Sequence, residues 1–80
     1  MADLYSSIRD FLARNLGLKH AEIDSETPLF SSGLLDSFAM VELVAFVESH
    51  ASVKVRARDV TLDNFDSIER IQKFVARART

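Results

Sequence analysis

Apolar side chains recur at three- and four-residue spacing in two stretches of the chain, one near each end. The first stretch runs from Ala2 to Leu16 and is followed by Gly17, a residue type that commonly ends a helix. The second stretch runs from Phe65 to Ala78. The apolar positions in the two stretches are Leu4, Ile8, Phe11, Leu12, Leu16, Phe65, Ile68, Ile71, Phe74 and Val75. This spacing predicts two amphipathic helices, each with one buried face.

The segment after the first predicted helix, residues 18–36, loses this spacing and contains Pro28, Gly33 and several serines. Such a composition is typical of a loop. A loop of this length is unusual in a compact domain unless it is fixed to the core or has a function. Its large apolar residues are Ile23, Leu29, Phe30, Leu34 and Leu35. They favour an ordered loop that is held against the core.

Helical spacing returns in residues 37–50, whereas the segment that follows is short and ambiguous. Val53 and Val55 alternate as in a strand, but no second strand is predicted to pair with them, so we expect a loop with one helical turn at residues 61–64. The predicted fold class is all-α: a small bundle of three main helices plus one short helix, with a long first loop. Residues 1–80 are expected to form a single domain.

The predicted central helix is apolar on two sides when its positions are placed on a helical wheel. One side, as a helix packed on a core requires, carries Met40, Leu43, Val44, Val47 and Ala51. We refer to the opposite side, Phe38, Val41 and Ala45 edged by Glu42 and Glu48, as the outer face of this helix. Either neighbouring helices cover both sides, or the outer face is an exposed patch that docks onto a partner.

Composition excludes several kinds of chemistry. The chain has 80 residues and no cysteine, which rules out disulfides, cysteine-based zinc sites and thiol nucleophiles. The two histidines, His20 and His50, lie far apart in the sequence, so no metal site is predicted. A single small core leaves little room for an enclosed active site. The chain is therefore not expected to be an enzyme.

Neither a membrane nor a nucleic acid is an expected partner. No apolar run is long enough for a signal peptide or a membrane span, which favours a cytoplasmic protein without membrane insertion. The formal net charge is -2, with eight acids against three bases in residues 1–50 and seven bases against four acids in residues 51–80. The bases of the last helix share it with Asp66 and Glu69. A continuous basic surface for nucleic acid is therefore not predicted.

Residues 33–38, Gly-Leu-Leu-Asp-Ser-Phe, end the loop and open the central helix. Asp36 is placed at or near the N-cap and Ser37 in the first turn, which is an ordinary way to begin a helix. The free N–H groups and the dipole at this end also stabilise an anion, so a phosphodiester on Ser37 would be favourably placed. A nucleophilic Ser37 is not expected, since no histidine is near in sequence and the glycine pattern of a nucleophile elbow is missing.

The stretch Gly33-Leu34-Leu35-Asp36-Ser37-Phe38, followed by Val41-Glu42-Leu43-Val44, resembles the attachment motif of the acyl carrier and peptidyl carrier proteins. The resemblance covers essentially the whole chain, including the long loop and the last helix. It implies that a phosphopantetheinyl transferase attaches the 4'-phosphopantetheine arm of coenzyme A to Ser37, and that Asp36 helps the transferase to recognise the site. It further implies that acyl or aminoacyl groups ride as thioesters on the thiol of the arm.

The resemblance also implies which partners the chain has. They are the transferase, a ligase that loads acyl or aminoacyl groups, and downstream acyl-transfer enzymes. The residues expected to meet them are Phe38, Val41, Glu42, Ala45 and Glu48. The residues expected to form the core that keeps the carrier rigid are Met40, Leu43, Val47, Val55 and Phe74. A monomer is expected, because the candidate apolar patch is needed for transient partners.

One feature departs from the pattern of fatty-acid carriers, which usually present a strongly acidic recognition helix. Here Glu42 is the only charge among residues 38–47, and Phe38 stands where leucine is commoner. Docking is therefore expected to rest on apolar contacts rather than on electrostatic steering. This favours a specialised stand-alone carrier that serves aminoacyl, D-alanyl or secondary-metabolite pathways.

Two other functions remain as alternatives. The first is a helical adaptor that binds a partner through Phe38, Val41 and Ala45 and never bears a prosthetic group. The second is a DNA-binding helix-turn-helix, which the long loop and the absence of bases on the central helix disfavour. Replacing Ser37 with alanine separates the first alternative from a carrier.

Overall fold

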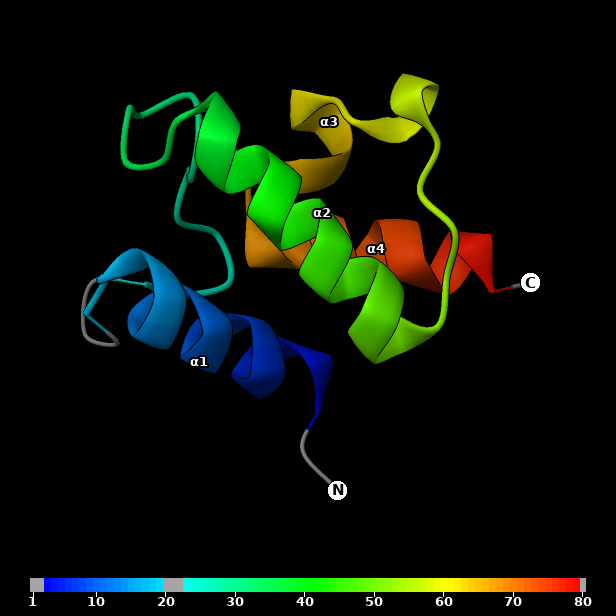
Figure 1. The fold of residues 1–80 in the computed structure, drawn as a ribbon, viewed down its shortest axis with the longest axis horizontal. Coiled ribbons are helices and arrows are strands. Elements are labelled where there is room, and N and C mark those ends of the chain that lie inside the picture. Colours follow the sequence, from blue (N-terminus) through cyan, green and yellow to red (C-terminus); the bar gives the residue numbers. More distant parts are fainter. Residues whose placement is uncertain (1–2, 20–22, 80) are drawn as a thin grey trace.

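The computed structural model describes residues 3–19 and 23–79, and every regular element in these ranges is helical. The elements in chain order are α1 (Leu4–Leu16), α2 (Ser37–Ala51), the 3-10 turn η2 (Ala57–Asp59), α3 (Leu62–Phe65) and α4 (Ile68–Ala78). Figure 1 shows α2 crossing in front of α4, with α1 below this pair and α3 above it. The predicted all-α bundle with a long first loop is confirmed.

Local capping sets the limits of α1. The carboxylate of Asp3 accepts a hydrogen bond from the backbone N–H of Ser6 at 2.7 Å, as an N-cap residue does. At the other end Gly17 adopts a φ of 73°, and its N–H donates back into the last turn, a conformation that glycine reaches without steric cost. The predicted helix end at Leu16 is confirmed, whereas the predicted start at Ala2 lies outside the described residues.

The last helix begins later than its apolar spacing predicts. The predicted start at Phe65 is wrong, because this residue ends α3 and α4 begins at Ile68. Ser67 has an extended backbone, and its hydroxyl accepts a hydrogen bond from the N–H of Arg70 at 3.2 Å. This side-chain cap stops the helix from extending back toward Phe65. The helical turn predicted at residues 61–64 is confirmed as α3, whereas η2 was not predicted.

The core lies where α1, α2 and α4 meet, and it also receives side chains from α3 and the first loop. Its buried apolar residues are Ile8, Leu12, Ile23, Leu29, Leu35, Ala39, Leu43, Val47, Ala51, Phe65, Ile68, Ile71, Phe74 and Val75. Ile23, Leu29 and Leu35 belong to the loop, so its predicted attachment to the core is confirmed. Leu34 is the exception, because it is 38% exposed and is not among the residues that pack against the core.

The buried side of α2 differs by about one position from the predicted side. Its buried residues, spaced by four, are Ala39, Leu43, Val47 and Ala51. Residues spaced by four lie one above the other along a helix, and the core meets α2 along this line. Met40 and Val44 lie beside the line and are only half-buried, as is Val55 in the segment after the helix. The core positions predicted for Leu43, Val47 and Phe74 are confirmed as buried, whereas Met40, Val44 and Val55 pack against the core but are only partly buried.

Candidate functional site

The N-terminus of α2 is built from the two residues that the sequence singled out. Asp36 has an extended backbone, and its Oδ1 accepts a hydrogen bond from the N–H of Ala39 at 2.9 Å. Its carbonyl oxygen accepts a second hydrogen bond from the N–H of Met40 at 3.1 Å. Ser37 is the first residue of the helix. The predicted N-cap and the predicted helix start are both confirmed.

The hydroxyl of Ser37 is available for chemistry. Ser37 is exposed, and its side chain has no hydrogen-bond partner among the residues that the structure describes. The first N–H groups of a helix have no partner inside it, and the side chain of Asp36 accepts a hydrogen bond from that of Ala39. The N–H groups of Ser37 and Phe38, together with the positive end of the helix dipole, favour an anion here. A phosphodiester on Ser37 Oγ fits this environment.

The loop that leads into Asp36 is held close to the helix start. The N–H of Leu35 donates to the carbonyl of Leu29 at 2.8 Å, and the N–H of Gly33 donates to the carbonyl of Phe30 at 3.0 Å. Gly33 has a φ of 84°, in the left-handed region that favours glycine. Leu29 and Leu35 are both buried. The chain is thus fixed to the core one residue before the N-cap.

A carboxylate from the junction of α3 and α4 anchors the same loop. Asp66 is only 7% exposed, and its Oδ1 accepts hydrogen bonds from the N–H groups of Phe30 at 2.7 Å and Ser31 at 2.9 Å. Its Oδ2 accepts a hydrogen bond from the hydroxyl of Ser31 at 2.6 Å. The backbone carbonyl of Asp66 accepts another from the N–H of Leu29 at 2.7 Å. These contacts tie the loop to the start of α4.

Asp66 is held in its charged form. Burial raises the pKa of this carboxyl, but the hydrogen bonds from the side chain and backbone of Ser31 and from the backbone of Phe30, with the charge of Arg70, outweigh burial and lower the pKa below its ordinary value. Sequence reasoning missed this anchor, because it treated Asp66 only as an acid within the last helix. The available signal was an aspartate directly before the N-cap serine of α4.

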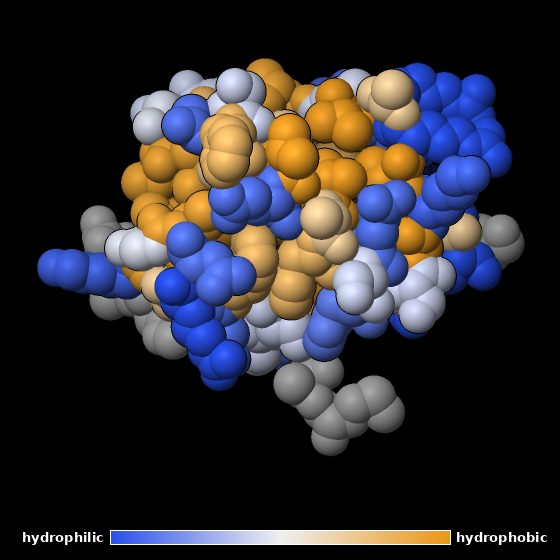
Figure 2. Space-filling model, viewed as in Figure 1, coloured by the Kyte–Doolittle hydropathy of each residue, from blue (hydrophilic) through white to orange (hydrophobic). Residues whose placement is uncertain are grey.

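The outer face of α2 is open. Phe38 and Val41 are 73% and 69% exposed, and Ala45 is exposed as well. Val60 and Leu62 add exposed apolar surface, and Figure 2 shows apolar atoms gathered over the region of α2 and α3. No helix in the described part of the chain covers this face. The interpretation in which neighbouring helices cover both sides of the central helix is therefore excluded.

The two acids at the edge of the outer face have different surroundings. Glu48 is half-buried, and its carboxylate accepts a hydrogen bond from the N–H of Val55 at 2.9 Å. This contact holds the segment that follows α2. Glu42 is also half-buried and faces a groove between α1 and α2. The partner-binding role of both acids stays a prediction, and Glu48 has a structural role as well.

The described residues include neither a candidate metal site nor a membrane-spanning helix. Over residues 3–19 and 23–79, no acids and histidines cluster in a way that would hold a metal ion. Within the same ranges, no helix has the length and apolar character needed to cross a membrane. His20 lies outside the described residues.

Comparison with known proteins identifies this arrangement. A family model described as "Phosphopantetheine attachment site" matches residues 6–75. The chain is also 30% identical over 57 residues to the probable acyl carrier protein PigG of a Serratia species. That match covers 71% of this chain and 66% of the relative, so the chain spans slightly less than two thirds of the relative's length.

The site fits the group for which this family is named. Ser37 offers an exposed hydroxyl at the positive end of α2, and the adjoining Phe38 offers apolar surface along which a flexible arm can lie. The family match extends over most of the chain and includes the α2 N-terminus. The chain therefore belongs to the phosphopantetheine-attachment family of acyl and peptidyl carrier proteins, whose members bear covalently attached 4'-phosphopantetheine and are carriers rather than catalysts.

Proposed function

We propose that this chain carries acyl or aminoacyl groups as thioesters on a 4'-phosphopantetheine arm attached to Ser37, and presents them to partner enzymes. The observation that supports this most strongly is the exposed Ser37 hydroxyl at the capped N-terminus of α2. It lies within the residues that match the family model. The arm supplies the thiol that this cysteine-free chain lacks.

In this role the protein is a rigid platform for a flexible tether. The tether keeps the cargo at a raised effective concentration near each partner's active site, while the docking itself stays weak enough for release. The partners are a phosphopantetheinyl transferase, a loading ligase for acyl or aminoacyl groups, and downstream acyl-transfer enzymes. The low charge of the outer face supports partners of a specialised pathway rather than those of general fatty-acid synthesis.

Incubation with coenzyme A and a broad-specificity phosphopantetheinyl transferase tests the proposal directly. Intact-protein mass spectrometry is expected to show the gain of one phosphopantetheine, and fragmentation is expected to place it on Ser37. A folded protein that stays unmodified, or that is modified at another residue, would contradict the proposal.

Asp36 is proposed to present its negative charge to the transferase while it caps α2. Asp36→Asn keeps a favourable N-cap residue but removes the charge, so the fold should persist. The transferase kcat/KM for the variant is expected to fall about tenfold, which corresponds to about 1.4 kcal/mol for a lost charge-assisted contact. Asp3→Asn, which changes the N-cap of α1 in the same way, is the matched control. Equal rates for both variants would show that the charge of Asp36 has no such role.

The outer face is proposed to bind partners through apolar contact. Phe38→Ser removes a side chain that is 73% exposed, so the fold should tolerate it. If Phe38 is buried by the transferase, the loss of about 2 kcal/mol of apolar burial is expected to raise KM roughly thirtyfold. In Asp36→Asn, which lacks the proposed charge contact, added salt should change KM little, because salt screens charges and not apolar contacts. A steep salt dependence with no effect of Phe38→Ser would contradict apolar docking.

A further inference from the structure

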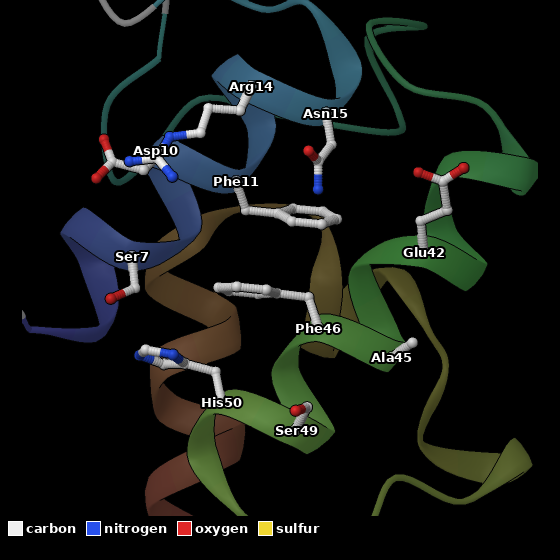
Figure 3. A pocket seen from close by; sticks show the side chains of 10 residues that line it. All are labelled: Ser7, Asp10, Phe11, Arg14, Asn15, Glu42, Ala45, Phe46, Ser49 and His50. Atoms are coloured by element: carbon white, nitrogen blue, oxygen red, sulfur yellow. The ribbon is translucent and has the colours of Figure 1, made fainter.

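A groove runs between α1 and α2 on the side of α2 that faces away from η2. Its volume is about 670 Å³, which is within the range of small-molecule sites. Figure 3 shows aromatic rings at its centre and polar side chains around them, including Ser7, Asn15, Glu42 and Ser49. The groove is therefore apolar in the middle and able to form hydrogen bonds at its rim.

Three stacked rings form the centre of this groove. Phe46 of α2 lies between Phe11 of α1, with ring centroids 4.5 Å apart, and His50 of α2, with centroids 5.2 Å apart. The ring planes differ by only 21° and 11°, and Figure 3 shows the stack nearly edge-on. Both faces of Phe46 are covered, so ring edges line the groove. Ring edges are electropositive and attract the electron-rich face of another aromatic ring.

A smaller hollow lies beside the N-terminus of α2. It is lined by Asp36 and Phe38, the two neighbours of Ser37, and by Leu34 and Asn15. Asn15 also lines the larger groove. The two hollows therefore share Asn15 as a lining residue, and the proposed route from the neighbours of Ser37 to the stacked rings runs past this side chain.

The length of this path suits a phosphopantetheine arm. Ser37 and Ala45, which borders the groove, are eight residues apart on α2, or about 12 Å at the rise of a helix. From phosphorus to sulfur the arm has about thirteen bonds, roughly the length of four extended residues, or about 14 Å. A group carried on the thiol can therefore reach the rings while the arm lies in the smaller hollow.

The groove suits a compact planar group better than a long alkyl chain. The core beneath it is filled by Leu12, Leu43 and Val47, each 0% exposed, and close-packed interiors do not open without cost. A second hollow on the other side of α2, bordered by Met40, Val44 and Val60, has a volume of about 260 Å³. Its lining includes no aromatic ring and shares no residue with the hollow beside Ser37.

We propose that the carried acyl group is a compact aromatic one, and that it lies in the groove between α1 and α2 with its ring face against the edges of Phe11, Phe46 and His50. This inference rests on the proposed function, because it requires an arm on Ser37. It adds the position of the cargo and its chemical class.

The test uses a broad-specificity transferase to load the protein in one step from benzoyl-coenzyme A or from cyclohexanecarbonyl-coenzyme A. The two acyl groups are similar in size, but only benzoyl has an aromatic face. The readout is the set of nuclear Overhauser effects between cargo protons and side-chain protons of the protein. These are compared instead of chemical shifts, since the ring current of benzoyl moves shifts by itself.

We expect contacts from benzoyl to Phe46 and Ser49, and much weaker contacts from cyclohexanecarbonyl. The proposed position of the cargo would be overturned by benzoyl contacts to Met40, Val44 or Val60. It would also be overturned if benzoyl contacted only residues at the N-terminus of α2. Equal contacts for the two groups would overturn its aromatic class. Intact mass of the same sample separates the two proposals: a loaded protein without groove contacts overturns this inference alone, whereas a protein without an arm overturns the proposed function as well.

Two variants of the loaded protein check the assignment. Ser49→Arg places a long side chain in the groove from an exposed position, so it should fold normally and lose the benzoyl contacts. Val60→Arg makes the same kind of change beside the other hollow and should keep them. If Val60→Arg lost the benzoyl contacts and Ser49→Arg kept them, the cargo would lie in the hollow beside Val60, and the inference would be overturned.

Discussion

Ser37→Ala is expected to take up no phosphopantetheine at all under conditions that modify the wild type completely. The hydroxyl oxygen of Ser37 is the proposed attachment atom, and alanine has no hydroxyl. Its side chain is exposed and has no hydrogen-bond partner among the described residues, so its removal should leave the fold intact. Intact-protein mass spectrometry measures the modification, and circular dichroism checks the helices.

Ser49→Ala is the matched control for this experiment, because Ser49 is an exposed serine on the same helix. It should be modified as fully as the wild type. Modification of Ser37→Ala would show that the arm is attached elsewhere. The same variant addresses the adaptor alternative: an adaptor that binds through the outer face keeps its activity in Ser37→Ala, whereas a carrier loses every transfer of cargo.

Asp66→Ala is expected to lower the free energy of unfolding by about 3 kcal/mol. The change removes the acceptor of two N–H groups and one hydroxyl in the loop, and each hydrogen bond to a charged group is worth about 1.5 to 3 kcal/mol. The loop can recover part of this loss by turning toward water, so the total stays below the sum. In a domain of this size the Tm is expected to fall by roughly 15 °C. Thermal and urea unfolding monitored by circular dichroism measure both quantities.

Asp63→Ala controls for the loss of an acid from the same region. The side chain of Asp63 is 98% exposed and lies 4.0 Å from Arg70, and an exposed ion pair of this kind contributes little. Its removal should change stability by less than about 0.5 kcal/mol. If Asp63→Ala and Asp66→Ala were equally destabilised, the buried hydrogen bonds of Asp66 would not be the cause.

The pH dependence of stability offers a second check on Asp66. Its pKa is lowered in the folded protein, so the charged form stabilises the fold. This contribution is fully present above the unfolded-state pKa of about 3.9 and is lost as the pH falls through the folded-state pKa. The difference in stability between wild type and Asp66→Ala should therefore be large near neutral pH and should shrink in acid. Asp3 and Asp24 also have lowered pKa values, and the comparison with Asp66→Ala removes their effect.

Much of the fold could be predicted from short-range patterns. The start of α2 depends on Asp36 and on residues within one turn of it, and the end of α1 depends on Gly17. Where prediction failed, a nearby cap had competed with apolar spacing: Ser67 starts α4 three residues after Phe65, although both residues are buried. Apolar spacing records burial, but it does not record where the backbone changes direction.

The residues of the candidate site also fall into those that short-range patterns predict and those that they do not. Ser37 and Asp36 were identified from the sequence because a helix start and its cap involve neighbours in the chain. Asp66 was missed because its partners Phe30 and Ser31 are 36 and 35 positions away. The groove at Phe46 was missed as well, since it exists only where α1 lies beside α2.

By itself the sequence determined the helical class, the position of the loop, and the two residues at the proposed attachment point. These depend on interactions within a turn or two, which spacing and capping residues encode directly. Only the tertiary structure decided that the outer face of α2 is open, that Asp66 anchors the loop before Ser37, and that stacked rings line a groove between α1 and α2. Each of these depends on which distant segments pack together, and helical periodicity is the same whether a face meets solvent or a neighbour.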